Sequence, residues 1–475
     1  ERSSAASDVY KRQWWHSPST FEGISFDSPR WVDLGEQEPG QRPRPVLKSK
    51  VLAGLATIKR LQERHHLPIE RLTALWYGFK YIGKEDQQTL FDQLFNDQHA
   101  VTDGWDPYLT PRRWTVRSVP GMDGPTAEDH AIRSRLMGAL RISEKQLDCL
   151  VKILSGQEAH LIVLDGGYLK RLYGLVQSAR LFHLDVEAFS RLLTVLKLTS
   201  VDSLEELWEL SERARWMTTT GLNVDELDYL INDVQSTRFA LNVDHADLLE
   251  MAERLRGQAR ETDDSSDPGA REAALHRAIL GELSELLSAD TDLLTVTIEH
   301  FTPVMSMTTL VHTLLSIEPN KSIPPAFSST PTSYLFKLHK VLFVASEFNL
   351  SAVELRHILS KPEGIGIQNL LKLTWEDLEN IQTYRMLRDS FDAQEDSLLK
   401  LLASPEKTMT NKALLLEVES ITGWDGNQLS ALVDWFGIES RQPGAPGLPP
   451  ELLSIEGLQR LKSCFDLAEA MGVDV

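Results

Sequence analysis

Three short segments of this chain resemble sites that bind phosphate groups or metal ions. Residues 78–85 have the glycine and lysine spacing of a Walker A loop, but Glu85 stands where a Ser or Thr hydroxyl would bind magnesium. Residues 364–366 lack the third glycine of a dinucleotide-binding fingerprint. Residues 290–292 open like a calcium loop without its later Gly and Glu. These patterns favour loops and turns, and we predict no bound cofactor.

The histidines and cysteines form no recognised reactive set. His65 and His66 are adjacent, whereas a zinc-binding helix places its histidines at i and i+4 on one face, so we expect a helix-end charge interaction or solvent exposure. Cys149 and Cys464 lie far apart in apolar helical patterns, which favours buried structural thiols over a disulfide or a thiolate metal site. We predict no catalytic, cofactor-binding or metal-binding residue.

A recurrent pattern predicts where many short helices start. An apolar residue precedes Ser, Thr, Asn or Asp, and a Glu, Gln or Asp follows two or three positions later, before another apolar residue. The short side chain can accept a hydrogen bond from the first turn, and the third helical residue can bind the cap in return. The full pattern has caps at Ser143, Asn223, Ser351, Thr374 and Asp425, and a looser form has caps at Asp165, Asp185 and Ser454.

The helix starts predict an all-α fold, an irregular solenoid-like stack of helical hairpins with almost no sheet. We expect a non-native, adapter-derived tail and then helical segments separated by irregular ones. The segments are the tail over 1–13, an irregular lead-in over 14–50, a helical segment with an irregular loop over 51–126, a helical array over 127–256, an acidic loop over 257–272, and a second array over 273–475 with Pro-rich breaks at 320–333 and 441–450.

Composition narrows the possible functions. Hydrophobic residues make up 42% of the 475, which is enough for a packed core. The 69 acidic and 49 basic residues give a formal charge of −20, and the basic residues are scattered among carboxylates, so nucleic-acid binding is disfavoured. No apolar run is long enough to cross a bilayer and no signal peptide is visible. The first residue is not Met, and we interpret the chain as a fragment of a longer protein.

The order of the capped segments resembles the A component of the Tc insecticidal toxin complexes, specifically its large α-helical shell. The likeness covers about residues 50–475. The individual motifs would be shared by any capped helix with flanking apolar residues, so the resemblance depends on their order along the chain. The segments that carry it are 90–96, 169–185, 221–230, 339–355 and 422–429. The acidic insert near Asp263 and the Pro-rich break near Pro324 depart from the family pattern, which leaves the local helix count open there.

The resemblance implies a role as well as a fold. It implies a secreted or cell-surface toxin, a homo-pentamer of A-component protomers around a pore-forming channel, and a B–C cocoon component that carries the toxic enzyme. The target-cell membrane would be reached by regions outside this fragment, which would supply shell wall. A pH change opens such shells. The histidines that could sense acid are therefore His65, His66, His183, His339 and His357.

Two other interpretations remain open. A stand-alone α-solenoid could bind peptides or proteins on a concave face, and it would stay monomeric while it did so. An enzyme with its site in the irregular region 77–126 is a third possibility, although no convergent acid, base or metal set is visible there.

Overall fold

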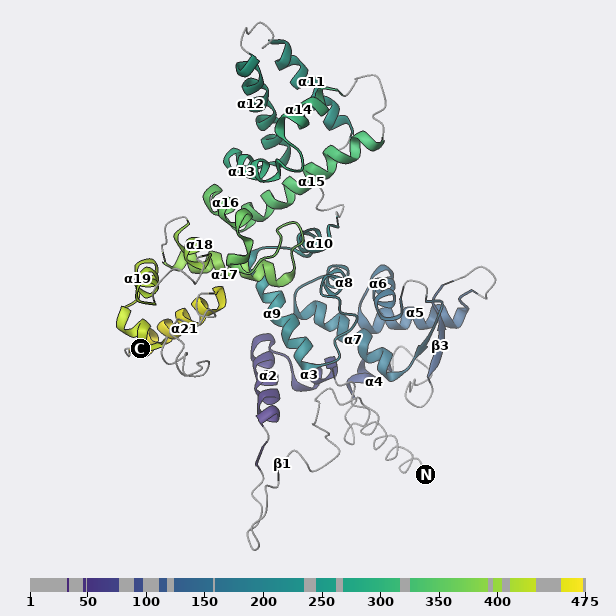
Figure 1. Ribbon diagram of the computed structural model, residues 1–475. Coiled ribbons are helices and arrows are strands. Elements are labelled where there is room, and N and C mark those ends of the chain that lie inside the picture. The colour runs from purple at the N-terminus through teal and green to yellow at the C-terminus, as the bar shows by residue number, and fades with distance from the viewer. Residues whose placement is uncertain are drawn as a thin grey trace, which may run out of the picture. The chain divides into compact units, whose positions relative to one another are not determined.

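The computed structural model confirms the all-α fold, with two short pairs of strands added to the helices (Figure 1). The chain divides into two compact units, residues 1–225 and residues 226–475. The structure describes residues 32–33, 46–47, 49–76, 89–96, 111–117, 124–156, 159–234, 245–261, 268–316, 325–391, 396–403, 411–432 and 454–472.

The N-terminal unit is a set of short helices packed around helix α7. Helix α3 lies against α7, α8 packs on both α6 and α7, and α2 packs on α9. The helices of this unit are α2 (Ser49–His65), α3 (Ile69–Trp76), α4 (Leu90–Phe95), α5 (Ala127–Leu140), α6 (Glu144–Ser155), α7 (Gly166–Leu181), α8 (Val186–Val195) and α9 (Leu204–Thr220), and α10 (Val224–Asn232) begins where the unit ends.

Helix α7 is largely buried, and α3 approaches its backbone closely. Leu169, Leu172, Leu175 and Val176 are fully buried. Gly174 faces α3, and a Cβ atom added there would lie 2.8 Å from the carbonyl oxygen of Leu75. The absent side chain therefore allows α3 to pack directly on the α7 backbone.

Among the described residues, two antiparallel strand pairs interrupt the helices. Strands β1 (Val32–Asp33) and β2 (Val46–Leu47) form one pair, and β3 (Arg112–Thr115) and β4 (Leu161–Leu164) form the other, with Trp114 opposite Ile162. Along β4, buried residues alternate with exposed ones, as expected for a strand with one covered face. Strand β4 was not predicted from the sequence, because its four residues are too few to establish an alternating period.

The C-terminal unit continues the array with further helical pairs. Helix α13 packs on α12, α15 and α16, helix α11 packs on α12 and α14, and α17 packs on α21. The elements are α11 (His245–Glu261), α12 (Pro268–Leu287), α13 (Thr291–Phe301), α14 (Met307–Leu315), α15 (Pro325–Glu347), α16 (Ala352–Ser360), the 3₁₀ helix η2 (Pro362–Ile365), α17 (Trp375–Phe391), α18 (Ser397–Leu402), α19 (Asn411–Thr422), a helix over 426–432, and α21 (Ile455–Met471).

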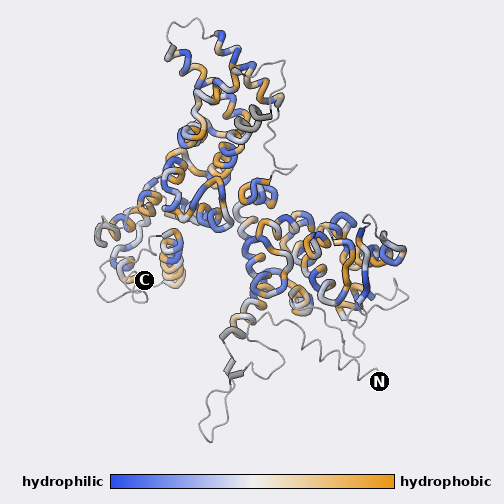
Figure 2. Tube along the Cα trace, turned by 45° about the vertical axis from the view of Figure 1, so that its right-hand side comes forward, coloured by the Kyte–Doolittle hydropathy of each residue, from blue (hydrophilic) through white to orange (hydrophobic). Residues whose placement is uncertain are grey.

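Hydrophobic and hydrophilic residues are interspersed along the helices (Figure 2), and helices such as α6 and α8 carry an apolar side and a polar side. The apolar sides meet in the core of each unit, where leucine is the main buried residue. Burial of these stripes is the main source of stability for helices this short, because isolated helices of such length are marginal in water.

The predicted helix starts agree with the structure. Ser143 and Ser351 each form a reciprocal capping box, with Gln146 and Glu354 as the respective partners. Thr374 does the same with Asp377. The side chains of Asp165, Asp185, Asp425 and Ser454 each accept a backbone N–H of the first helical turn, and α10 begins directly after Asn223.

Helix ends follow a rule that the sequence analysis did not find. At four links one non-glycine residue adopts a positive φ, the next residue is apolar, and the one after it caps the following helix. The N–H of the apolar residue returns to a carbonyl in the last turn, as in a Schellman motif. The links are 141–143, 183–185, 288–290 and 349–351. The apolar residue before each cap therefore donates a hydrogen bond that closes the preceding helix and also directly precedes the cap of the next one.

Two expected irregular segments are shorter than predicted. The acidic loop was expected over 257–272, but α11 extends to Glu261 and α12 begins at Pro268. The Pro-rich break was expected over 320–333, but α15 begins at Pro325 and runs through Pro331. Pro325 is the first residue of α15, where a proline loses no hydrogen bond because its N–H would be unpaired. Pro331 lies beyond the first turn and leaves one helical hydrogen bond unmade. The break at 441–450 and the tail over 1–13 lie outside the described residues.

Candidate functional site

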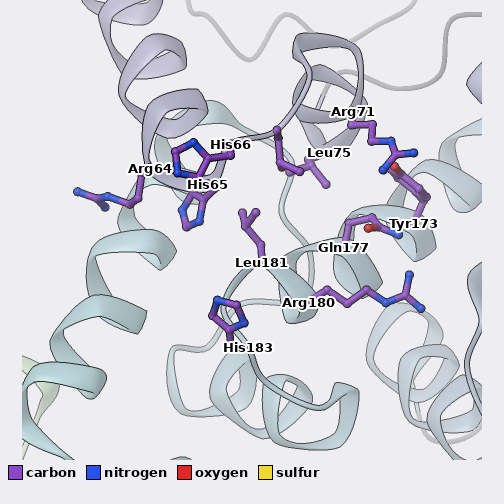
Figure 3. A pocket seen from close by; sticks show the side chains of 11 residues that line it. Arg64, His65, His66, Arg71, Leu75, Tyr173, Gln177, Arg180, Leu181 and His183 are labelled. Atoms are coloured by element: carbon purple, nitrogen blue, oxygen red, sulfur yellow. The ribbon is translucent and has the colours of Figure 1, made fainter.

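The structure brings three of the five candidate histidines together in one pocket of the N-terminal unit. His65, His66 and His183 line an open cavity of about 370 Å³ (Figure 3). His339 and His357 belong to the C-terminal unit and lie in separate environments. The Walker A-like segment 78–85 lies outside the described residues.

The pocket is built where two helices end. His65 is the last residue of α2, and His66 follows it with a φ of 51°; His183 follows α7 with a φ of 57°. Both left-handed residues turn the chain out of a helix, and the following link carries the next helix back. His65 and His66 therefore lie at a helix end, and the side chain of His66 is exposed.

One wall of the pocket comes from a single face of α7. Tyr173, Gln177 and Arg180 are spaced at i, i+4 and i+7, so they lie above one another on that face. Arg71 from α3 stands beside them, and the three histidines lie on the other side of the cavity (Figure 3). The buried residues Leu75 and Tyr173 belong to the lining.

His65 is held in place by contacts on two sides. Its Nε2 lies 3.0 Å from the Ser211 hydroxyl of α9, and its ring meets Phe182 edge to face at 6.0 Å. Burial lowers the pKa of His65 below its ordinary value, and the positive charge of Arg64 lowers it further. The uncharged imidazole is therefore the form that the folded protein favours.

Arg64 is occupied by partners on α9. Its guanidinium donates to Glu212 at 2.7 Å and to Ser211 at 3.0 Å, and it lies 4.7 Å from the centre of the Trp208 ring. These contacts tie the end of α2 to α9 and leave little free charge on Arg64.

His339 lies in an aromatic cluster of the C-terminal unit. Its Nδ1 is 2.6 Å from the hydroxyl of Tyr229, and its ring stacks on Phe343 with centroids 6.1 Å apart. Burial lowers the pKa of His339, so its protonation would work against this packing.

His357 is near the C-terminal end of α16. Burial and the neighbouring Lys361 lower its pKa, and its Nε2 is buried without a hydrogen-bond partner. His339 and His357 thus resist protonation for the same main reason, which is loss of solvent.

Buried ionic groups tie the helices of the C-terminal unit together, and the sequence analysis missed them. Glu354 is 1% exposed and accepts two hydrogen bonds from Arg388, at 2.9 and 3.1 Å, and one from the Tyr384 hydroxyl. Lys340 is also 1% exposed and donates to Asp233 and to the backbone carbonyl of Leu371. Each charge is paired, as burial requires, which favours a structural role.

Asp129 plays a similar part in the N-terminal unit. It completes the capping box of Thr126 at the start of α5 and accepts the N–H of Thr115 at 2.7 Å, which joins β3 to the helix. Burial alone would raise the pKa of Asp129, but the hydrogen bonds from Thr126 and Thr115 lower it overall.

Within the described ranges, no group of three or more His, Cys, Asp or Glu side chains is placed to hold a metal ion. Over the same residues, none of the helices combines the length and the apolar composition needed to cross a bilayer. The side chains that come together at the pocket are instead basic, which suits binding of an anion better than metal ligation.

The fold defines a class of protein, an array of short, capped helices. Two structures determined by cryo-electron microscopy share this fold. TcdA4 of Morganella morganii matches with a TM-score of 0.59 and 17% sequence identity, over 89% of this chain and 17% of that one. TcaA-TcaB of Yersinia pseudotuberculosis matches with a TM-score of 0.52 and 14% identity, over 91% of this chain and 23% of that one.

These matches confirm the resemblance to Tc toxin subunits at the level of the fold. This chain spans less than a quarter of the length of either structure. A scan against protein-family models found no match, and a search of curated proteins found none. The order of the capped segments thus indicated the helical arrangement, although sequence identity to the two structures is only 17% and 14%.

Proposed function

We propose that this chain is a structural, non-catalytic segment of a Tc-type toxin translocation subunit, forming shell wall around a pore-forming channel. The observation that carries the proposal is the similarity to TcdA4 over 89% of this chain. In this role the helices pack side by side, and their buried ionic groups fix the packing.

The proposed role includes partners that belong to the whole protein. The subunit would be secreted, would assemble as a homo-pentamer and would bind a B–C cocoon component. It would reach the target membrane through regions outside this segment.

Cryo-electron microscopy of the product of the complete reading frame would test this proposal. We expect a pentameric shell in which residues 49–472 form part of the wall. A monomeric product that captures peptides on this segment would overturn the proposal and favour the α-solenoid scaffold. A pentamer with this segment inside the channel would overturn the wall assignment alone.

We also propose that His65, His66, His183, His339 and His357 contribute to acid sensing in the shell. His65, His339 and His357 have lowered pKa values, so taking up protons at acidic pH works against the folded packing around them. Single replacement of each by Gln should move the pH midpoint at which the full-length pentamer opens. An unmoved midpoint in all five variants would refute acid sensing at these positions.

A further inference from the structure

The pocket of the N-terminal unit is locally basic although the chain carries a formal charge of −20. Three arginines and three histidines line it, and no carboxylate is among its described lining residues. Charges beyond about 8–10 Å are largely screened at physiological salt, so the local set decides what the pocket attracts.

Not all of these cations are explained by the helix ends at which they lie. A cation at the C-terminus of a helix interacts favourably with the helix dipole, which accounts for Arg64 and Arg180. Arg71, in contrast, lies in the first turn of α3, where the dipole disfavours a positive charge. Arg71 is exposed and forms no ion pair or hydrogen bond with another described residue.

The charge on Arg180 is also without a described carboxylate partner. Its guanidinium donates to the backbone carbonyls of Leu140 and Arg141. Burial lowers the pKa of Arg180, and the nearby positive charge of Arg141 lowers it further. An anion in the pocket would relieve this repulsion, because it would offset two like charges at once.

We propose that the pocket binds an oxyanion of the phosphate class, held by Arg71, Gln177 and Arg180, and binds it more tightly as its histidines gain protons. The side chains of Gln177 and Arg180 project from one face of α7 and that of Arg71 from α3, on the same side of the cavity (Figure 3). Guanidinium and amide N–H groups are suited to bind such oxygens.

The charged groups around the histidines set the sign of the pH dependence. Arg71 and Arg180 line the cavity as cations, whereas the guanidinium of Arg64 is paired with the nearby carboxylate on α9, Glu212. Tyr173 contributes a phenol, which is uncharged at neutral pH. A proton on any of the three histidines therefore raises the positive potential of the pocket and favours the anion.

Isothermal titration calorimetry of the 475-residue chain with inorganic phosphate, at an ionic strength held constant with sodium chloride, would test the binding. Arg71→Gln should weaken binding by roughly ten- to a hundredfold, the usual worth of a charged hydrogen bond. Arg60→Gln is the matched control. Arg60 is exposed on α2 and does not line the pocket, so its substitution removes the same charge at a different place. Phosphate affinity that is equal in these two variants would overturn the proposal.

Sulfate tests the pH dependence because it stays a dianion while the histidines titrate. Its affinity should rise as the pH falls from about 8 to about 5.5, the range in which imidazole changes charge. His183→Gln should make that rise shallower, and circular dichroism would show that the variant is folded. A sulfate affinity independent of pH would contradict the role given to the histidines.

Two sources of the phosphate group can be separated. Free phosphate binding would indicate a soluble phosphate ester. Binding to phosphatidylcholine vesicles that contain phosphatidic acid, without free phosphate binding and lost in Arg71→Gln, would indicate a lipid headgroup. No binding in either arm would overturn the proposal while leaving the shell-wall assignment untouched.

Discussion

Removal of the Glu354 carboxylate is expected to destabilise the C-terminal unit strongly. Glu354 receives two hydrogen bonds from Arg388 and one from Tyr384, and it also accepts the N–H of Ser351 at 2.8 Å. Glu354→Ala would remove one acceptor of the Arg388 guanidinium and the acceptor of the Tyr384 phenol, and it would open the capping box of α16. Breaking a buried ion pair from one side costs about 3–5 kcal/mol.

The expected value lies toward the lower end of that range. Arg388 also donates to Asp389 at 2.7 Å, so part of its charge stays satisfied after the substitution. Glu354→Gln keeps one acceptor oxygen but places an NH₂ group among donors, and we expect a loss of about 1–3 kcal/mol.

Hydrogen exchange measured by mass spectrometry suits this test because the chain has two units and need not unfold in one step. Peptides from α16 and α17 should exchange faster in Glu354→Ala, while peptides from α7 in the other unit serve as an internal reference. The matched control is Glu299→Ala, which removes a carboxylate paired with Arg356 at 3.0 Å, with both side chains 59% exposed.

We expect the control substitution to cost less than about 1 kcal/mol, as is usual for surface ion pairs. A Glu354→Ala effect no larger than that of Glu299→Ala would refute the reasoning. It would mean that the buried network adds no more than an exposed pair and that apolar packing alone fixes α16 against α17.

Three further predictions concern single residues. Gly174→Ala should destabilise the contact of α3 with α7 by about 1–3 kcal/mol, because the added Cβ would lie 2.8 Å from the Leu75 carbonyl oxygen. Thermal unfolding should show a lowered Tm, and an unshifted Tm would mean that the two helices move apart without cost. The lowered pKa of Asp129 means that its contribution is present above its unfolded pKa of 3.8 and is lost as the pH falls through the folded value. Asp129→Asn should therefore reduce stability at neutral pH and flatten its acid dependence, as urea unfolding at several pH values would show. Burial lowers the pKa of His339 below its ordinary value of 6.5. At acidic pH the unfolded chain therefore binds the proton more readily than the folded protein, so stability decreases as the pH falls. His339→Gln should lessen that fall in hydrogen exchange of α15, and an unchanged pH dependence would contradict it.

Helix starts could be predicted from the sequence because they depend on neighbours in the chain. The side chains of Ser143 and Ser351 bind backbone groups three residues away, so the residue types themselves indicate the contact. The equivalent capping boxes at Thr126 and Ser203 were not predicted, because Pro125 and Asp202 replace the apolar residue that the pattern required. A capping box can therefore form without the apolar residue that precedes the cap at the other helix starts.

The pocket and the buried networks could not be found in the same way. Arg71 and Arg180 come from helices far apart in the chain, and their proximity depends on the packing of α3 on α7. A weak local signal did exist for the histidines. His66 and His183 each follow a helical stretch, and the left-handed residue of a helix end is often polar because bulky branched side chains are strained there.

The two units should respond to acid by different routes. His66 and His183 are exposed at the pocket rather than packed in the core, so a positive charge on them acts on anion binding. His339 and His357 are partly buried and disfavour the charged form, so their protonation is coupled to loosening of the surrounding helices. Replacing His339 by Gln should therefore lessen the pH dependence of hydrogen exchange in α15 and leave the pH dependence of anion affinity unchanged. If the variant also lost the pH dependence of anion affinity, the pocket and the helical packing would be sensing the same titration.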